Sequence, residues 1–194
     1  GALMFLGCPL RMILRLGGSD LNALFGIAGF AGGIGFGTIF LKRGYSLQRT
    51  YALSKLESAM MPAIQVALLV LVVTAPAFIF FSQKGPGAMH APWLISLAAG
   101  LVVGGLSQFS RLCTVGGFRD LFLFKKSILI FGYLAVLVGV FVVNISFGNF
   151  HLGFENQPIA HTDGLWNFLG MALAGFCSVL LGGCPLRQLI MTGE

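Results

Sequence analysis

The chain has 194 residues, of which 57% are hydrophobic and only 9% are charged, and its mean hydropathy is +0.92. Soluble domains carry about 25% charged residues. The composition therefore excludes a soluble domain and predicts an all-α integral membrane protein. The net charge of +6 comes from basic residues clustered between apolar stretches. That distribution indicates membrane topology rather than nucleic-acid binding.

One pentapeptide, Gly-Cys-Pro-Leu-Arg, occupies residues 7–11 and again residues 183–187. Each copy follows an apolar stretch and precedes a short apolar segment, which predicts an internal repeat. The chain begins inside an apolar stretch, and no charged segment followed by a cleavage site predicts a signal peptide in it. We therefore expect a segment of a longer protein or a chain that lacks a first half. In this interpretation 1–16 ends a first repeat and 17–194 forms a second.

Proline is favoured at the first position of a helix, so Cys8 and Cys184 are the expected N-cap residues of short helices. A thiol at an N-cap faces free backbone N–H groups and the positive end of the helix dipole, and both favour thiolate. Arg11 and Arg187 follow at the third helical position. This combination is suited to binding an anion. The alternative is a buried structural cysteine beside a proline that begins a helix.

Apolar stretches predict the transmembrane helices, and breaks between them predict short half-helices. The expected transmembrane helices lie near residues 21–41, 60–81, 91–108, 127–147 and 165–182. The expected re-entrant half-helices lie near 113–124 and 184–191. Pro62 falls at the start of its span and Pro76 inside it, where we expect a kink. The glycines of 21–41 have small-xxx-small spacing, which favours close helix packing over a glycine-lined path for substrate.

Basic residues indicate the orientation of these spans. Lys42, Arg43, Lys55, Lys125 and Lys126 lie at one set of boundaries, as does Arg49. The loops at the opposite boundaries, 82–90 and 148–164, contain one lysine. The positive-inside rule places the basic boundaries in the cytoplasm, so the first pentapeptide lies toward the outer face and the second toward the inner face. Opposite orientation of the two copies predicts an inverted repeat.

Cys113 resembles the pentapeptide cysteines because it follows a span, precedes a glycine-rich turn and lies near arginines. Cys8, Cys113 and Cys184 are thus candidate stations along a substrate path, whereas Cys177 lies mid-span and is expected to pack in the core. Arg11, Arg119 and Arg187 are candidate anion-attracting residues. For Arg119 with Asp120, and for Arg15 with Asp20, a structural ion pair is the alternative. Intramembrane charge usually faces a cavity or a partner.

The pentapeptide and the sequence Arg-Leu-Cys-Thr-Val-Gly-Gly-Phe-Arg-Asp (111–120) resemble the YeeE/YedE family of bacterial inner-membrane sulfur transporters. The likeness covers nearly the whole chain and is greatest to the YedE branch, associated with selenium metabolism. It implies an hourglass-like, multi-pass protein in which short helices from both faces meet. It also implies that Cys8, Cys113 and Cys184 relay thiosulfate inward through S–H···S hydrogen bonds. The family has a further cysteine upstream of the first Cys-Pro motif, and that part is absent here.

We therefore expect a transporter of a small inorganic sulfur or selenium anion, and not an enzyme. The alternatives are an intramembrane thiol enzyme, such as a sulfurtransferase or thiol oxidoreductase, and a subunit that only packs with partners. Membrane lipid and a cytoplasmic sulfur-carrier protein are the other candidate partners. We expect no cofactor and no nucleic acid. His90, His151 and His161 have no second ligand at metal spacing, so we expect no metal.

Overall fold

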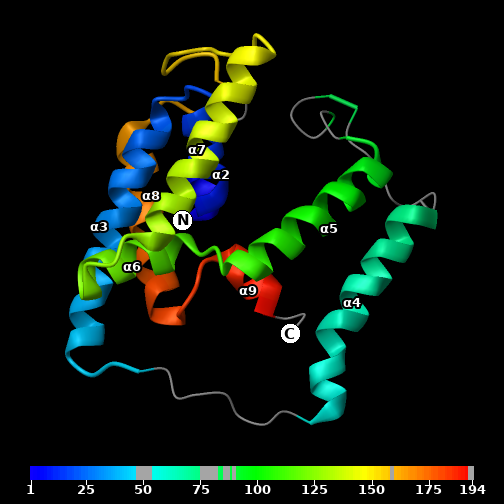
Figure 1. Ribbon diagram of the computed structural model, residues 1–194, viewed down its shortest axis with the longest axis horizontal. Coiled ribbons are helices and arrows are strands. Elements are labelled where there is room, and N and C mark those ends of the chain that lie inside the picture. The colour runs from blue at the N-terminus through cyan, green and yellow to red at the C-terminus, as the bar shows by residue number, and fades with distance from the viewer. Residues whose placement is uncertain (47–53, 75–82, 85–87, 89–90, 158–159, 192–194) are drawn as a thin grey trace. The chain divides into compact units, whose positions relative to one another are not determined.

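A computed structural model of the chain describes residues 1–46, 54–74, 83–84, 88, 91–157 and 160–191. The described residues form helices and no strand (Figure 1). The helices are α1 (Ala2–Phe5), α2 (Pro9–Gly17), α3 (Asn22–Lys42), α4 (Lys55–Thr74), α5 (Trp93–Ser110), α6 (Thr114–Phe124), α7 (Ile128–Ser146), α8 (Gly164–Leu181) and α9 (Pro185–Met191). The all-helical class predicted from composition is confirmed.

Five helical segments among the described residues are long and apolar enough to cross a membrane. They are Asn22–Lys42, Lys55–Thr74, Trp93–Phe124, Ile128–Ser146 and Gly164–Met191. They lie where the sequence predicts its five spans and are compatible with a multi-pass membrane protein. The re-entrant course of the short helices, the inverted repeat and the hourglass-like shape stay predictions. The predicted kink at Pro76 and the end of the 60–81 span lie outside the described residues.

The chain divides into two compact units. Unit 1 consists of Gly1–Leu47 and Leu112–Gln188, and unit 2 consists of Gln48–Arg111 and Leu189–Glu194. Unit 2 contains α4 and α5, and no residue of α4 is buried. Unit 1 contains the hydrophobic core and all four cysteines, so the site is built there.

Close contact between α3 and α8 forms the centre of unit 1 (Figure 1). A Cβ added to Gly29 would overlap the carbonyl oxygen of Phe168, and one added to Gly33 would overlap that of Ala172. A Cβ added to Gly175 of α8 would likewise overlap the carbonyl oxygen of Phe30. The hydrophobic effect does not drive helices together within a membrane, so they associate through close van der Waals packing of this kind. Gly29 and Gly33 of α3 are thus packing positions, as their spacing predicts.

The start of α4 differs from the prediction. The apolar stretch suggests a start near Met60, but the helix begins at Lys55. The reason is a capping box: the Ser54 hydroxyl accepts from the Glu57 N–H at 3.4 Å, and Glu57 Oε2 accepts from the Ser54 N–H at 3.0 Å. Pro62 consequently lies inside the helix rather than at its start.

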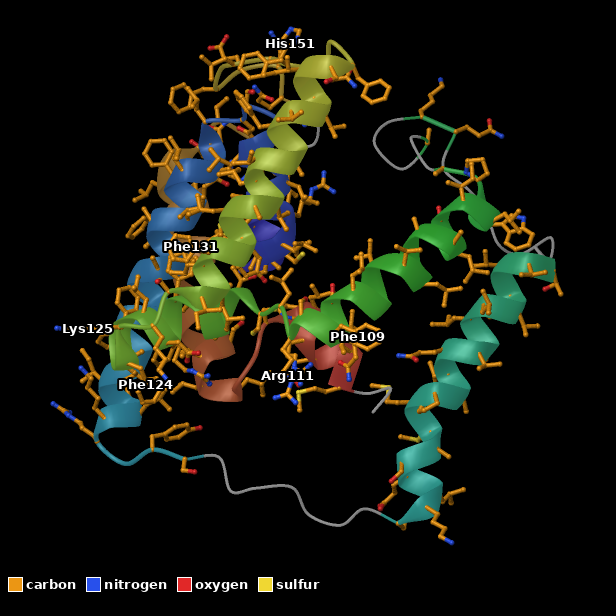
Figure 2. The ribbon with its side chains drawn as sticks, in the orientation of Figure 1. Phe109, Arg111, Phe124, Lys125, Phe131 and His151 are labelled. Atoms are coloured by element: carbon orange, nitrogen blue, oxygen red, sulfur yellow. The ribbon has the colours of Figure 1, made fainter. Side chains whose placement is uncertain are left out.

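A polar clasp joins the turn after α2 to the loop after α7. Ser19 and Leu21 exchange backbone hydrogen bonds with Gly153, at 3.3 and 3.2 Å. The Asn22 amide donates to the Phe154 carbonyl oxygen at 2.7 Å. His151 lies in this same loop (Figure 2). The clasp fixes α2 against α7 and α3, so the first pentapeptide is held at a defined place in unit 1.

Candidate functional site

Cys8, Cys113 and Cys184 each stand directly before a helix, as the first residue outside it. Their carbonyl oxygens accept the first bond of α2, α6 and α9, from Met12 at 3.0 Å, Gly117 at 2.9 Å and Gln188 at 3.0 Å. Pro9 and Pro185 occupy the first helical position, where a missing N–H costs nothing. The N-cap placement predicted for Cys8 and Cys184 is therefore what the structure shows.

Two of the thiols also make the side-chain part of the cap. The Gly116 N–H points to the Cys113 sulfur at 3.4 Å, and the Arg187 N–H hydrogen-bonds to the Cys184 sulfur. Each donor is the third residue of its helix, the usual partner of an N-cap side chain. Both sulfurs therefore lie against free helix N–H groups. Cys8 makes no such side-chain cap bond among the described residues.

The three cysteines come together in space. The side chains of Cys113 and Cys184 lie close enough to interact with each other, and Cys184 also lies close to Thr114. Tyr133 of α7 lies within electrostatic range of Cys8, Cys113 and Cys184. Residues from both ends and the middle of the chain thus lie within electrostatic range of one tyrosine. This grouping, the cysteine cluster, consists of these three cysteines with Thr114 and Tyr133.

Four of the five residues of the cysteine cluster are closed to solvent. Cys113 is 7% exposed, Cys184 1%, Thr114 1% and Tyr133 6%. The Thr114 hydroxyl donates to the Tyr133 oxygen at 2.9 Å, which satisfies a buried polar pair. Cys8 is only half-buried. A path through the cluster would therefore begin at the more open thiol and continue to two enclosed ones.

Local sequence explains why these turns form. Gly182 has φ +90° and ends α8 in the left-handed conformation that glycine adopts most easily. In both pentapeptides the arginine side chain folds back over the glycine before the cysteine. A Cβ at Gly7 would lie 2.8 Å from Cδ of Arg11, and one at Gly183 would lie 3.4 Å from Cγ of Arg187. The glycine therefore leaves room for the arginine beside the helix start.

The arginines near the cysteine motifs differ in their hydrogen-bond partners. Arg119 donates from Nε and Nη2 to Asp120 Oδ1, at 3.0 and 2.9 Å, so it forms the ion pair that was the alternative. Arg15 pairs with Asp20 at 2.6 Å in a buried bridge. Nε of Arg11 is buried without a hydrogen-bond partner among the described residues. Arg11 is thus the predicted anion-attracting residue that has unused donor capacity.

The burial of Cys177 differs from the prediction. Its place in mid-span suggests core packing, but it is exposed on α8. The side of α8 that packs carries Asn167, Met171, Gly175 and Val179, at intervals of four residues. Cys177 falls between these positions, on another face of the helix. It is therefore neither in the core nor in the cysteine cluster.

Sequence reasoning missed Thr114 and Tyr133. Thr114 follows Cys113 directly and is a plausible cap neighbour, but nothing in the spacing links α7 to the pentapeptides. A comparison with protein-family models, curated proteins and solved structures finds no match for this chain. The chemistry of the site thus rests on its residues: three thiols, helix N–H groups and a buried hydroxyl pair.

Proposed function

We propose that the protein conducts a small sulfur-containing anion, thiosulfate-like, or a selenium-containing compound into the cytoplasm along Cys8, Cys113 and Cys184. The observation that supports this most is the proximity of Cys113 and Cys184, with Cys8 within electrostatic range of the same Tyr133. Their resemblance to the pathway cysteines of the YeeE/YedE family gave the expectation, and that resemblance also leads us to propose the bacterial inner membrane as the location. The proximity of the thiols fits a relay over short steps.

The chemistry of the cluster suits a soft anion. Thiols are polarizable and are weak S–H donors, so they favour sulfur or selenium over oxygen. Helix N–H groups at Cys113 and Cys184 add positive potential without a mobile counter-charge. The low exposure of both residues keeps competing water away. Weak, repeated contacts also let the anion leave each station, which conduction requires.

Uptake by the purified full protein in proteoliposomes tests the proposal. We expect labelled thiosulfate to enter faster than in protein-free vesicles. Selenium anions measured in parallel distinguish the two substrate classes. Vesicles that take up neither class faster than the protein-free control would refute transport.

An intramembrane thiol enzyme is the second candidate, favoured by the proximity of the Cys113 and Cys184 thiols. A sulfurtransferase would take the outer sulfur of thiosulfate onto a cysteine thiolate, forming a persulfide and releasing sulfite. Intact mass spectrometry after thiosulfate treatment separates the candidates. A gain of one sulfur atom on Cys113 or Cys184 supports the enzyme, and an unchanged mass during active uptake supports conduction.

A further inference from the structure

A polar pocket of about 320 Å³ lies beside the first pentapeptide, apart from the cysteine cluster. We call it the arginine pocket. Its walls include Arg11, Leu14, Arg15, Asp20, Asn144 and Gln157, from α2, the turn after α2, α7 and the loop after α7. A water molecule takes about 30 Å³, so the pocket has room for about ten waters, or for a small anion with part of its hydration.

Arg15 is held so that one nitrogen stays unpaired. Its Nε donates to Asp20 Oδ2 at 2.6 Å and its Nη1 to the Phe5 carbonyl oxygen at 2.8 Å. The Phe5 ring supports the guanidinium, with Cζ 4.3 Å from the ring centroid. The residue is 8% exposed, and its Nη2 has no hydrogen-bond partner among the described residues. A buried donor without a partner is costly, so Nη2 is the part of Arg15 that the described residues leave unsatisfied.

Arg11 brings a second unpaired donor to the same wall. It lies one helical turn before Arg15, so the two side chains share a face of α2. Its Nε is also buried without a partner among the described residues. Two guanidinium groups and one carboxylate, Asp20, leave the pocket one positive charge in excess. The residual positive charge favours an anion.

The polar side chains opposite are already used by the fold. Asn144 donates to the Gly17 and Val140 carbonyl oxygens, and Gln157 donates to those of His151 and Gly153. They shape the pocket rather than offer it donors. The ligand contacts are therefore guanidinium N–H groups, which recognise oxyanion oxygens. Guanidinium groups therefore bind sulfate as readily as thiosulfate, because both anions present sulfur-bound oxygens that accept hydrogen bonds.

We propose that the arginine pocket is a reception site that binds small divalent oxyanions, sulfate as well as thiosulfate, and that selection for sulfur occurs only later, at the thiols. Cys8 caps the N-terminus of α2, and Arg11 and Arg15 line the pocket from that helix. The turn after α2 and the loop after α7 lie on the outer side in the predicted topology. Because Arg11 is the third residue of α2, an anion bound at Arg11 is about one helical turn from the thiol of Cys8. The inference rests on the proposed anion transport for its purpose, but binding is measured without transport.

Calorimetric titration of the purified full protein in detergent with sodium sulfate and with sodium thiosulfate tests the proposal. We expect both anions to bind, with dissociation constants within about tenfold of each other. Arg11→Gln weakens both by roughly ten- to hundredfold, the effect of losing charge-assisted hydrogen bonds. Arg43→Gln, an exposed arginine beyond α3, is the matched control and binds as wild type. Absence of sulfate binding, or unchanged binding by Arg11→Gln, would overturn the proposal.

A second pair of variants covers the case in which Arg11→Gln does not fold. Leu14 lines the pocket and is 40% exposed, so polar replacements leave the core intact. Leu14→Glu places a negative charge at the pocket and weakens the binding of both anions. Leu14→Gln, whose side chain has the shape of glutamate without the charge, leaves binding intact. Equal affinity of these two variants for sulfate would contradict an electrostatic site.

Cys184→Ala distinguishes this inference from the transport proposal. The residue lies outside the arginine pocket, so we expect its variant to bind sulfate and thiosulfate as wild type does. A protein that binds both anions through Arg11 but takes up neither would refute transport and leave the reception site supported. Loss of sulfate binding in Cys184→Ala equal to that in Arg11→Gln would refute a separate site.

Discussion

Replacing Asp20 by alanine removes the acidic partner of a buried cation. Asp20 accepts from Arg15 Nε at 2.6 Å and from the Asn22 backbone and side-chain amides at 2.9 and 3.0 Å. The side chains of the ion pair are only 6% and 4% exposed. Breaking a buried pair costs about 3–5 kcal/mol because the remaining charge has no counter-ion. The Phe5 carbonyl and ring stay in place and hold Arg15 in the same buried site.

The matched control is Asp120→Ala. Its pair with Arg119 joins neighbouring residues whose side chains are 34% and 25% exposed, so solvent screens it. Such pairs contribute about 0–1 kcal/mol. At roughly 2–4 °C per kcal/mol for a chain of this size, Asp20→Ala lowers the melting temperature by about 6–20 °C and Asp120→Ala by less than about 4 °C.

Thermal denaturation in detergent, followed by size-exclusion chromatography, measures both. The double variant Arg15→Met with Asp20→Ala removes the orphaned charge and should recover part of the loss, by about 1–4 kcal/mol. Equal melting temperatures for Asp20→Ala and Asp120→Ala would refute the idea that burial makes the Arg15–Asp20 pair more important to stability than the Arg119–Asp120 pair. A double variant less stable than Asp20→Ala would refute the desolvation argument.

Two further predictions concern the helix pair and the thiols. Gly33→Ala forces a Cβ into the α8 backbone and should destabilise the protein by about 1–3 kcal/mol. The control Gly32→Ala, whose added Cβ meets nothing within 4 Å, should be neutral or stabilising by up to about 1 kcal/mol. Similar melting temperatures for the two variants would contradict the packing described. A mild thiol oxidant should join Cys113 to Cys184, detectable by peptide mapping, and block thiosulfate uptake until a reductant is added. Recovery of unlinked Cys113 and Cys184 after full oxidation would contradict their contact.

Local features could be predicted because they depend on neighbouring residues. Proline after cysteine predicts that α2 begins at Pro9 and α9 at Pro185, and both do. Glycines four apart predict the close face of α3. The capping box at Ser54 and Glu57 was also present in the sequence, and it explains why hydropathy alone placed the start of α4 too late.

Features that depend on packing between distant segments could not be predicted. The contact between Cys113 and Cys184 requires α6 and α9 to approach each other, and no spacing encodes that approach. Tyr133 looks like any aromatic residue of a span until α7 places it beside the thiols. Cys177 was expected in the core because it is apolar and mid-span, but the face that α8 presents to α3 excludes it.

The central claim is that the clustered cysteines carry the anion. Thiosulfate uptake by Cys113→Ala and Cys184→Ala, compared with Cys177→Ala in the same vesicles, tests it most directly. Cys177 is the matched control because it is a cysteine of unit 1 outside the cluster. We predict that both cluster variants fold but lose uptake, while Cys177→Ala transports at the wild-type rate. Wild-type uptake by both Cys113→Ala and Cys184→Ala would contradict the account.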